Sequence, residues 1–222
     1  MSTNTTSVWR KKLKELEIVV VIPTYNNGKT LAAVIEEVCR YADDIIVVND
    51  GSTDDTANIL EQYPAIRTIT HPVNKGKGTA LKHGLSQAKK EGFRYAITID
   101  SDGQHFASDI PCFIEAIEKE PDTLLVGARN LASDNMPGKN TFANKFSNFW
   151  FRLETGLKLE DTQSGYRLYP LRKMDVQSCW YTAKYEFELE AIVFAAWGDV
   201  VVKNIPIHVY YPCLLYTSPS PR

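Results

Sequence analysis

The sequence predicts a single α/β domain in which a mainly parallel sheet is covered by helices on both faces. Two observations lead to this fold class. Short runs of β-branched residues alternate with amphipathic segments through the first half of the chain, and strict alternation of strands and helices produces parallel pairing with buried strands. In addition, the 222 residues are 44% hydrophobic, which supplies one sizeable core.

The expected strands are β-branched runs bounded by turn residues. In chain order they are Glu17–Pro23, Asp44–Asp50, Ala65–Thr70, Tyr95–Asp100 and Thr123–Gly127. Segments with helical periodicity lie between them, at Thr30–Tyr41, Thr53–Gln62, Gly78–Glu91 and Ser108–Glu120. Ser52 and Ser108 are predicted to cap two of these helices, since serine side chains accept hydrogen bonds from the first free backbone N–H groups.

After Asn130 the alternation stops. An aromatic-rich segment, Phe142–Leu157, is followed by "DTQSGYRLYP", a predicted helix at Tyr185–Trp197 and a predicted strand pair around "VVVKNIPIHVYY". Because no linker separates this part, we interpret it as a C-terminal extension that completes the site. The predicted organisation is therefore an N-terminal leader (1–16), one domain (17–212) and an unstructured tail (213–222), "CLLYTSPSPR", which has no periodicity and is interpreted as an artefact of the sequence.

Composition excludes several classes of protein. The 25 basic and 27 acidic residues nearly balance, so nucleic-acid binding is not expected. The four cysteines are far apart, as expected of free thiols in a reducing cytoplasm rather than of a zinc site or a disulfide scaffold. The N-terminus lacks the apolar core of a secretory signal, and "AIVFAAWGDVVV" is too short and too interrupted to span a membrane.

The stretch "ITIDSDGQH" ends a predicted strand on two aspartates, Asp100 and Asp102, followed by Gly103 and Gln104. Two carboxylates at this spacing are typical of a solvated turn or of a site for Mg²⁺ or Mn²⁺, which prefer carboxylate oxygens together with phosphates. Ligands of parallel sheets bind at the carboxyl ends of the strands. That position favours a site for a metal and a diphosphate.

Three further loops lie at the same predicted edge. In "VVNDGSTDDT", Asp50 forms an ordinary turn or accepts hydrogen bonds from a base or ribose, and both interpretations stay open. In "IPTYNNGKT", Tyr25 packs against a base or belongs to a simple turn. The third loop, "NKGKGTALKHG", lacks the spacing of an ATPase phosphate loop, and a glycine-rich entry to a helix is the favoured interpretation.

Taken together, "VVVIPTYNNGKTL", "IIVVNDGSTDDT", "NKGKGTALKHGL", "IDSDGQH", "VGARN" and "DTQSGYRLYP" resemble, in this order, the motifs of family 2 inverting glycosyltransferases. The resemblance is to the polyprenyl-phosphate sugar synthases of that family and covers about residues 18–212. It implies a GT-A fold, a nucleotide-sugar donor and a divalent cation, Mg²⁺ or Mn²⁺.

The same resemblance implies the roles of individual residues. It places Pro23, Tyr25 and Asp50 at the nucleotide, and Asp100 and Asp102 at the metal with Gln104 beside them. The full set predicted to bind the donor is Pro23, Tyr25, Asn27, Asp50, Lys77 and Asp100. The resemblance also places Arg129 and Arg167 near donor or acceptor phosphate. Together with Asp102 and with Asp161, which is nominated as a downstream acid, the two arginines form the predicted catalytic set. Two positions depart from the family pattern: Asn27 stands where many relatives have glutamate, and Asn49 replaces the first of two aspartates, which leaves the base open between uracil and guanine.

The acceptor decides whether a general base is needed. A sugar hydroxyl must lose its proton, whereas a lipid phosphate is already an anion. Asp161, Glu186 and Glu188 are the downstream candidates for a base or for support of the metal site, and solvent-facing charges are an equally good interpretation. Phe142–Leu153 would suit contact with a membrane interface, although core packing is slightly favoured.

We therefore expect a hexosyltransferase of cell-envelope biosynthesis at the cytoplasmic face of a membrane. It would move a hexose from a donor of the GDP-mannose or UDP-glucose type to undecaprenyl or dolichyl phosphate, with inversion. Transfer to a hydroxyl of a glycolipid or polysaccharide is the first alternative. The second is a noncatalytic protein that binds nucleotide sugars.

Overall fold

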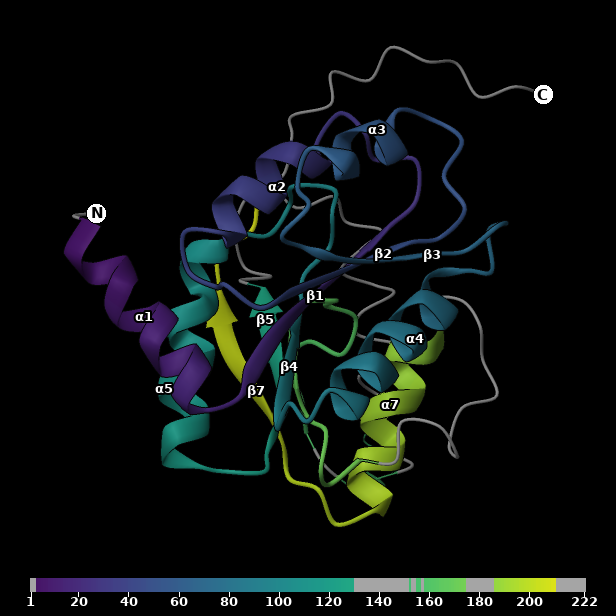
Figure 1. The fold of residues 1–222 in the computed structure, drawn as a ribbon. Helices are drawn as coiled ribbons and strands as arrows, with labels where there is room; N and C mark the ends of the chain where they lie inside the picture. The colour runs from purple at the N-terminus through teal and green to yellow at the C-terminus, as the bar shows by residue number, and fades with distance from the viewer. Residues whose placement is uncertain (1–2, 130–151, 153–154, 157, 175–185, 211–222) are drawn as a thin grey trace.

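A seven-stranded sheet lies at the centre of the computed structural model, which describes residues 3–129, 152, 155–156, 158–174 and 186–210 (Figure 1). The strands are β1 (Ile18–Thr24), β2 (Ile45–Asn49), β3 (Arg67–Thr70), β4 (Tyr95–Thr98), β5 (Leu124–Arg129), β6 (Arg167–Pro170) and β7 (Val202–Ile207). Their order across the sheet is β3-β2-β1-β4-β6-β5-β7. Only β6 runs antiparallel to its neighbours among these strands, so the predicted mainly parallel sheet is confirmed.

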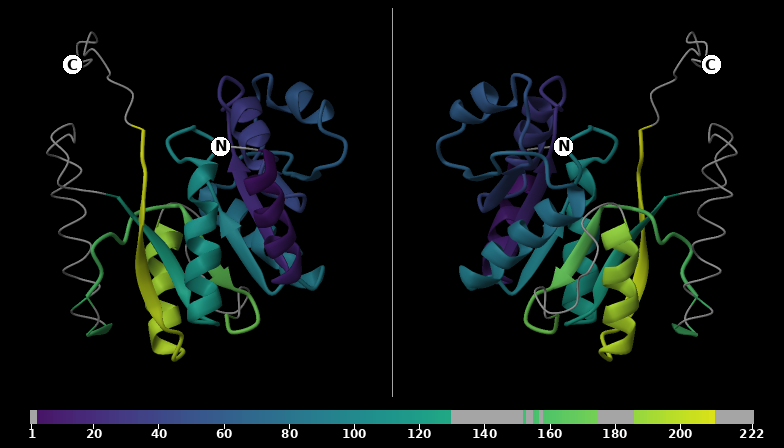
Figure 2. Two further views of the ribbon diagram at one scale, coloured as in Figure 1. Left: turned by 90° about the vertical axis from the view of Figure 1, so that its left-hand side faces the viewer. Right: turned by 90° about the vertical axis from the view of Figure 1, so that its right-hand side faces the viewer.

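Helices cover both faces of this sheet (Figures 1 and 2). They are α1 (Thr3–Glu15), α2 (Leu31–Val38), α3 (Thr56–Glu61), α4 (Lys77–Lys90), α5 (Ile110–Lys119), preceded by the short 3₁₀ turn η1 (Ala107–Asp109), and α7 (Glu186–Trp197). Apolar residues of α1, α2, α3 and α5 pack on one face, and those of α4 and α7 pack on the other.

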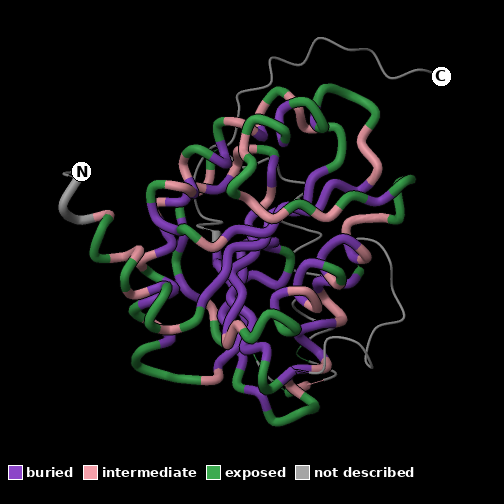
Figure 3. The backbone as a smooth tube through the Cα atoms, in the orientation of Figure 1, coloured by how far each residue is buried: buried purple, intermediate pink, exposed green. Residues whose placement is uncertain are grey.

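Strand β1 shows how the sequence builds the two layers. Alternate side chains of a strand point to opposite faces, so Ile18, Val20 and Ile22 join the first cluster while Val19 and Val21 join the second. All five are at most 1% exposed. Figure 3 shows the buried strands running through the middle of the molecule.

The C-terminal half differs from the sequence prediction. The segment "DTQSGYRLYP" contains β6, a strand of four residues that was not predicted and that inserts between β4 and β5. The predicted strand pair is wrong: β7 is a single strand, and Val209 beyond it forms an isolated antiparallel bridge with His105. The extension is thus part of the same sheet, and its last described residues reach the loop after β4.

Smaller differences concern the N-terminal half. Residues 3–15, expected to be a leader, form α1, whose Leu13 is buried in the first cluster. The predicted caps are also wrong. The helix after β2 begins at Thr56, where Asp54 accepts hydrogen bonds from the Thr56 backbone N–H and hydroxyl, and Ser108 lies inside η1.

Two findings concern membrane contact and cysteine chemistry. Across the residues that the structure describes, no helix combines the length and apolar character needed to cross a membrane. Cys39 and Cys112 are free thiols, as expected, whereas Cys179 and Cys213 lie outside the described residues.

Replacing Gly84 with alanine is expected to destabilise the fold. A Cβ atom at this position of α4 would lie 2.5 Å from Val21 Cγ1 and 3.1 Å from Val48 Cγ2, so the helix would have to move off the sheet. Overpacking of this kind costs about 1–3 kcal/mol, and the better helix propensity of alanine returns up to about 1 kcal/mol. Urea unfolding of Gly84→Ala should therefore show a net decrease in the free energy of unfolding. Ser86→Ala on the same helix is the control, and equal stability of both variants would contradict the close packing.

Candidate functional site

A cavity of about 510 Å³ opens at the edge of the sheet where strands β1, β2 and β4 end. Its lining is contributed by the end of β1, by the loops that follow β1, β2, β3 and β4, and by the start of α4. The lining residues are Pro23, Thr24, Tyr25, Asn27, Asp50, Asn74, Gly76, Lys77, Ala80, Asp100, Ser101 and Asp102. The structure therefore brings together all six residues predicted for the donor, and Asp102 joins them.

Lys77 bridges two carboxylates at the base of this cavity. Its ammonium lies 2.7 Å from Asp100 Oδ1 and 3.0 Å from Glu188 Oε1 of α7. Burial opposes the charge of Lys77, but Asp100 and Glu188 more than offset it and raise the pKa of the ammonium. Burial likewise disfavours the Asp100 carboxylate, yet Lys77, then His105 and Arg167, hold the pKa of Asp100 below its usual value. Both groups are therefore charged at neutral pH.

Gly165 leaves the space that this ionic cluster occupies. A Cβ atom there would lie 2.6 Å from Asp100 Oδ2, 2.8 Å from Glu188 Oε1 and 2.9 Å from Lys77 Nζ. The Gly165 carbonyl accepts a 2.7 Å hydrogen bond from the Thr98 hydroxyl of β4, which fixes this main chain against the cluster. The glycine of "SGYR" is thus explained by close approach of charged side chains.

The loop after β4 is held by polar contacts with the loop after β1. Thr30 Oγ1 donates to the Ser101 carbonyl at 2.6 Å, and Asn27 Nδ2 donates to Ser101 Oγ at 2.8 Å. Asp102 is exposed, and its Oδ1 accepts a hydrogen bond from the Gln104 backbone N–H at 2.9 Å. Asn27, predicted to contact the donor, therefore also positions the two-aspartate motif.

These residues suit a divalent cation that is shared with a phosphate ligand. Within the part of the chain that the structure describes, no three His, Cys, Asp or Glu side chains are placed to hold a metal ion by themselves. Mg²⁺ and Mn²⁺ are commonly held by one or two carboxylates, with phosphate oxygens and water as the other ligands. Asp100 and Asp102, which line one cavity, match that pattern. Gln104 is not among the lining residues and contributes its backbone N–H to Asp102.

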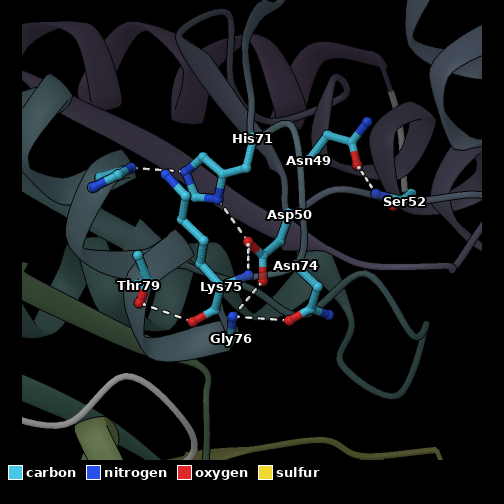
Figure 4. Close-up of polar contacts among 9 residues, drawn as sticks. Asn49, Asp50, Ser52, His71, Asn74, Lys75, Gly76 and Thr79 are labelled. Carbon is cyan, nitrogen blue, oxygen red and sulfur yellow. Dashed lines mark hydrogen bonds and ion pairs between the residues drawn. The ribbon is translucent and has the colours of Figure 1, made fainter.

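Asp50 organises the neighbouring wall of the cavity (Figure 4). Its Oδ1 is 2.6 Å from His71 Nδ1 and accepts from Lys75 N at 3.0 Å, and its Oδ2 accepts from Gly76 N at 2.8 Å. Asn49, the departure noted in the sequence, accepts a hydrogen bond from Ser52 N at 3.0 Å and closes its own turn. Asp50 is thus a turn residue and a cavity residue at once, and the two interpretations left open by the sequence are compatible.

Arg167, which is predicted to lie near a phosphate, is not among the residues that line the cavity. Its side chain is fully buried. The guanidinium donates to the carbonyls of Ser164 at 2.7 Å, Thr162 at 2.9 Å and Glu188. It joins the turn before β6 to α7 and adds positive charge near Asp100. Arg129 is the last residue of β5, and its side chain lies outside the described part.

The acidic candidates of the C-terminal half occupy different environments. Glu188 is 6% exposed and paired with Lys77, and Asp161 is fully buried and accepts a hydrogen bond from the Gln163 backbone N–H at 2.9 Å. For these two the interpretation as solvent-facing charges is wrong, while Glu186 is exposed. The aromatic segment Phe142–Leu153, for which core packing was slightly favoured over contact with a membrane interface, lies outside the described residues except for Arg152.

Sequence reasoning missed three residues that shape the site: His71, Ser101 and Gly165. Ser101 carried a usable signal, since it stands between the two aspartates. His71 follows a short edge strand and carries no local pattern that predicts contact with Asp50. Gly165 belongs to a quoted motif, but its reason is a contact with residues far away in the sequence.

Comparisons with known proteins agree with the predicted family and fold. The family model described as Glycosyl transferase family 2 matches residues 19–176. The UDP-N-acetylglucosamine–dolichyl-phosphate N-acetylglucosaminyltransferase of Methanococcus voltae is 31% identical over 215 residues, covering 87% of this chain and 86% of the relative. The polyprenol monophosphomannose synthase of Mycolicibacterium smegmatis is 27% identical over 201 residues, covering 85% and 75%.

A solved structure shows the same fold. Glucosyl-3-phosphoglycerate synthase from Mycobacterium tuberculosis, in complex with uridine diphosphate, matches with a TM-score of 0.69 at 20% identity, over 95% of this chain and 77% of that one. The predicted GT-A fold is thereby confirmed.

Replacing Arg167 with methionine is expected to cost stability. The change leaves three carbonyl acceptors near α7 and the turn before β6 without their donor. Removing the charged partner of buried groups typically lowers the free energy of unfolding by about 3 kcal/mol or more. Arg172→Met is the matched control, because Arg172 pairs with Glu17 at the surface, where such a change stays within about 0.5 kcal/mol. Denaturant unfolding compares the two, and equal small losses would contradict the structural role of Arg167.

Proposed function

This chain belongs to glycosyl transferase family 2, and from that membership we propose that it transfers a hexose from a nucleotide-sugar donor to a polyprenyl phosphate, with inversion. The observation that carries the proposal is the gathering of Asp50, Lys77, Asp100 and Asp102 on one cavity at the carboxyl edge of a parallel sheet. Relatives named as transferring sugars to dolichyl or polyprenol phosphate support the choice of acceptor.

The cavity wall has parts suited to a nucleoside diphosphate. Tyr25 is 45% exposed at the cavity and offers a ring face against which a base would pack. Asp50 retains acceptor capacity for a donor of the base or ribose, because a carboxylate has about four lone-pair sites and three N–H groups occupy it. Among the described residues that line the cavity, Lys77 carries the only ammonium group, and this group would contact the diphosphate.

Asp100 and Asp102 are the residues that would hold Mg²⁺ or Mn²⁺. When bound there, the divalent cation would supply positive charge to the diphosphate that departs with the nucleoside. The structure pairs Asp100 with Lys77, so a ligand that draws the ammonium toward its phosphates would free an Asp100 oxygen. Glu188 keeps a second carboxylate beside Lys77 during such a movement.

The transfer itself is a single displacement at the anomeric carbon. A phosphate oxygen of the acceptor forms the new C–O bond with its lone pair, and the bond to the diphosphate oxygen breaks, with its electron pair leaving on the nucleoside diphosphate. An anionic phosphate needs no general base. This suits the site, because none of the three candidates for a base, Asp161, Glu186 and Glu188, is among the residues that line the cavity. Asp161 accepts a hydrogen bond from the Gln163 backbone N–H, and Glu188 is paired with Lys77. A lipid acceptor would bring the protein to a membrane surface, peripherally.

The experiment that tests this proposal offers UDP-glucose, GDP-mannose and UDP-N-acetylglucosamine, each with radiolabelled sugar, together with polyprenyl phosphate and either Mn²⁺ or EDTA. Label extracted into organic solvent from one donor, and only with Mn²⁺, is the expected result and identifies the sugar. Metal-dependent hydrolysis of the donor without lipid product would overturn the phosphate acceptor in favour of a hydroxyl. Binding without hydrolysis or transfer would indicate a noncatalytic protein.

Asp102→Ala is expected to abolish metal-dependent transfer while the protein stays folded. The carboxylate is exposed and accepts a hydrogen bond from the Gln104 backbone N–H of its own loop, so its removal leaves the core unchanged. Loss of one group that stabilises transition-state charge lowers turnover by about a hundredfold or more. Electron paramagnetic resonance of Mn²⁺ with UDP gives a second readout, in which the variant should bind less metal. Asp43→Ala, a surface change, is the control; metal binding equal in both variants would contradict the assignment.

A further inference from the structure

A buried carboxylate and two histidines form a chain of hydrogen bonds at the cavity wall, and Figure 4 labels the carboxylate, Asp50, and the first histidine, His71. Asp50 follows β2 and is 2% exposed, and His71 follows β3 and is 4% exposed. His71 Nδ1 lies 2.6 Å from Asp50 Oδ1, and His71 Nε2 lies 2.7 Å from His83 Nδ1 on α4. His83 is exposed, so the chain runs from the cavity wall to solvent.

The partners fix where the protons lie. An ionised carboxylate only accepts hydrogen bonds, so His71 Nδ1 must carry the proton that Asp50 accepts. In neutral His71, Nε2 is then an acceptor, and His83 Nδ1 must be the donor to it. Partial desolvation, with His71, Lys75 and Lys90, lowers the pKa of His83 against the opposing effect of Asp50, which agrees with a neutral ring.

The same chain of hydrogen bonds also holds the loop that precedes α4. Asp50 accepts from the backbone N–H groups of Lys75 and Gly76, directly before Lys77. The two loops are in close contact, since a Cβ atom on Gly51 would lie 2.3 Å from the Val73 carbonyl carbon. The orientation of Asp50 thus sets the position of Asn74, Gly76 and Lys77, all of which line the cavity.

We propose that His71 is a positioning residue of the donor site: it holds the Asp50 carboxylate in one orientation toward the cavity, and His83 fixes the His71 tautomer that does so. The inference rests on the proposed function, because it takes the cavity to be where the nucleotide of the donor binds. Metal-ligating histidines are oriented by outer partners in the same way. Here the oriented group is a carboxylate that faces a ligand.

The tautomer is tested first, in the unmodified protein. A long-range ¹⁵N–¹H correlation spectrum of protein labelled at histidine distinguishes protonated from unprotonated ring nitrogens. The His71 signals are assigned by their loss in His71→Asn. A proton on Nδ1 and none on Nε2 is expected at pH 7.5, and the opposite tautomer would overturn the proposal.

Binding is tested with UDP and GDP in the presence of Mn²⁺ by calorimetry, using the nucleotide that the wild type binds more tightly. His71→Ala removes the donor to Asp50 and is expected to weaken binding about tenfold, as for loss of a hydrogen bond to a charged group. His71→Asn keeps an N–H near the Nδ1 position and is expected to restore most of the affinity. In turnover assays the alanine variant should raise KM for the donor with kcat nearly unchanged, since Asp50 acts on bound donor in ground and transition states alike.

Thr79→Val is the matched control. Thr79 Oγ1 donates to the Lys75 carbonyl at 3.1 Å, so the variant loosens the same loop without touching Asp50. An equal loss of affinity in Thr79→Val and His71→Ala, or no loss in His71→Ala, would overturn the role of His71 while the proposed function stands. Failure of the wild type to bind either nucleotide would overturn the proposed function and this inference with it.

Discussion

The cost of burying the Lys77 ammonium governs the construction of this site. A buried cation must be paired. The two partners of Lys77 come from distant parts of the sequence, since Asp100 follows β4 and Glu188 lies in the first turn of α7. The cluster therefore forms only when α7 is docked beside α4 on the second face of the sheet. Gly165 completes it by leaving room for the three charged groups. One electrostatic requirement thus ties the N-terminal half of the domain to its C-terminal half.

Strand β6 connects the residues around the Lys77 cluster through its backbone pairing and through Arg167. It pairs antiparallel with both β4 and β5, which places the turn 162–165 beside the carboxyl end of β4. Arg167, at the start of β6, closes that turn by donating to Thr162 and Ser164, and its third bond holds the Glu188 carbonyl on α7. The arginine thus orients the residue that pairs with Lys77. A guanidinium with five donors in a planar fork suits this task better than lysine would.

The sequence was sufficient to predict the features that depend on local pattern. Strand ends located Asp50, Asp100 and Asp102 on one edge, because carboxyl ends of parallel strands share an edge. The sequence was insufficient where contacts with residues far away along the chain determine the role of a side chain or the pairing of a strand. Arg167 was assigned to phosphate because nothing in "SGYR" reveals three carbonyls around its guanidinium. Strand β6 has four residues and pairs with strands far away in the sequence, and His71 is defined by a carboxylate 21 residues earlier. In each case the deciding interaction is tertiary.

The charge of the cavity bears on how a donor would enter it. Its described lining carries three carboxylates, Asp50, Asp100 and Asp102, and one ammonium, Lys77. Glu188 adds a further carboxylate behind that ammonium. A nucleoside diphosphate is itself an anion, so its approach to this lining alone would be repulsive at short range, where screening by salt is weak. A divalent cation that accompanies the diphosphate reverses the balance, since it is attracted to the carboxylates and to the phosphates alike. The arrangement therefore favours binding of donor and metal together over binding of the donor first.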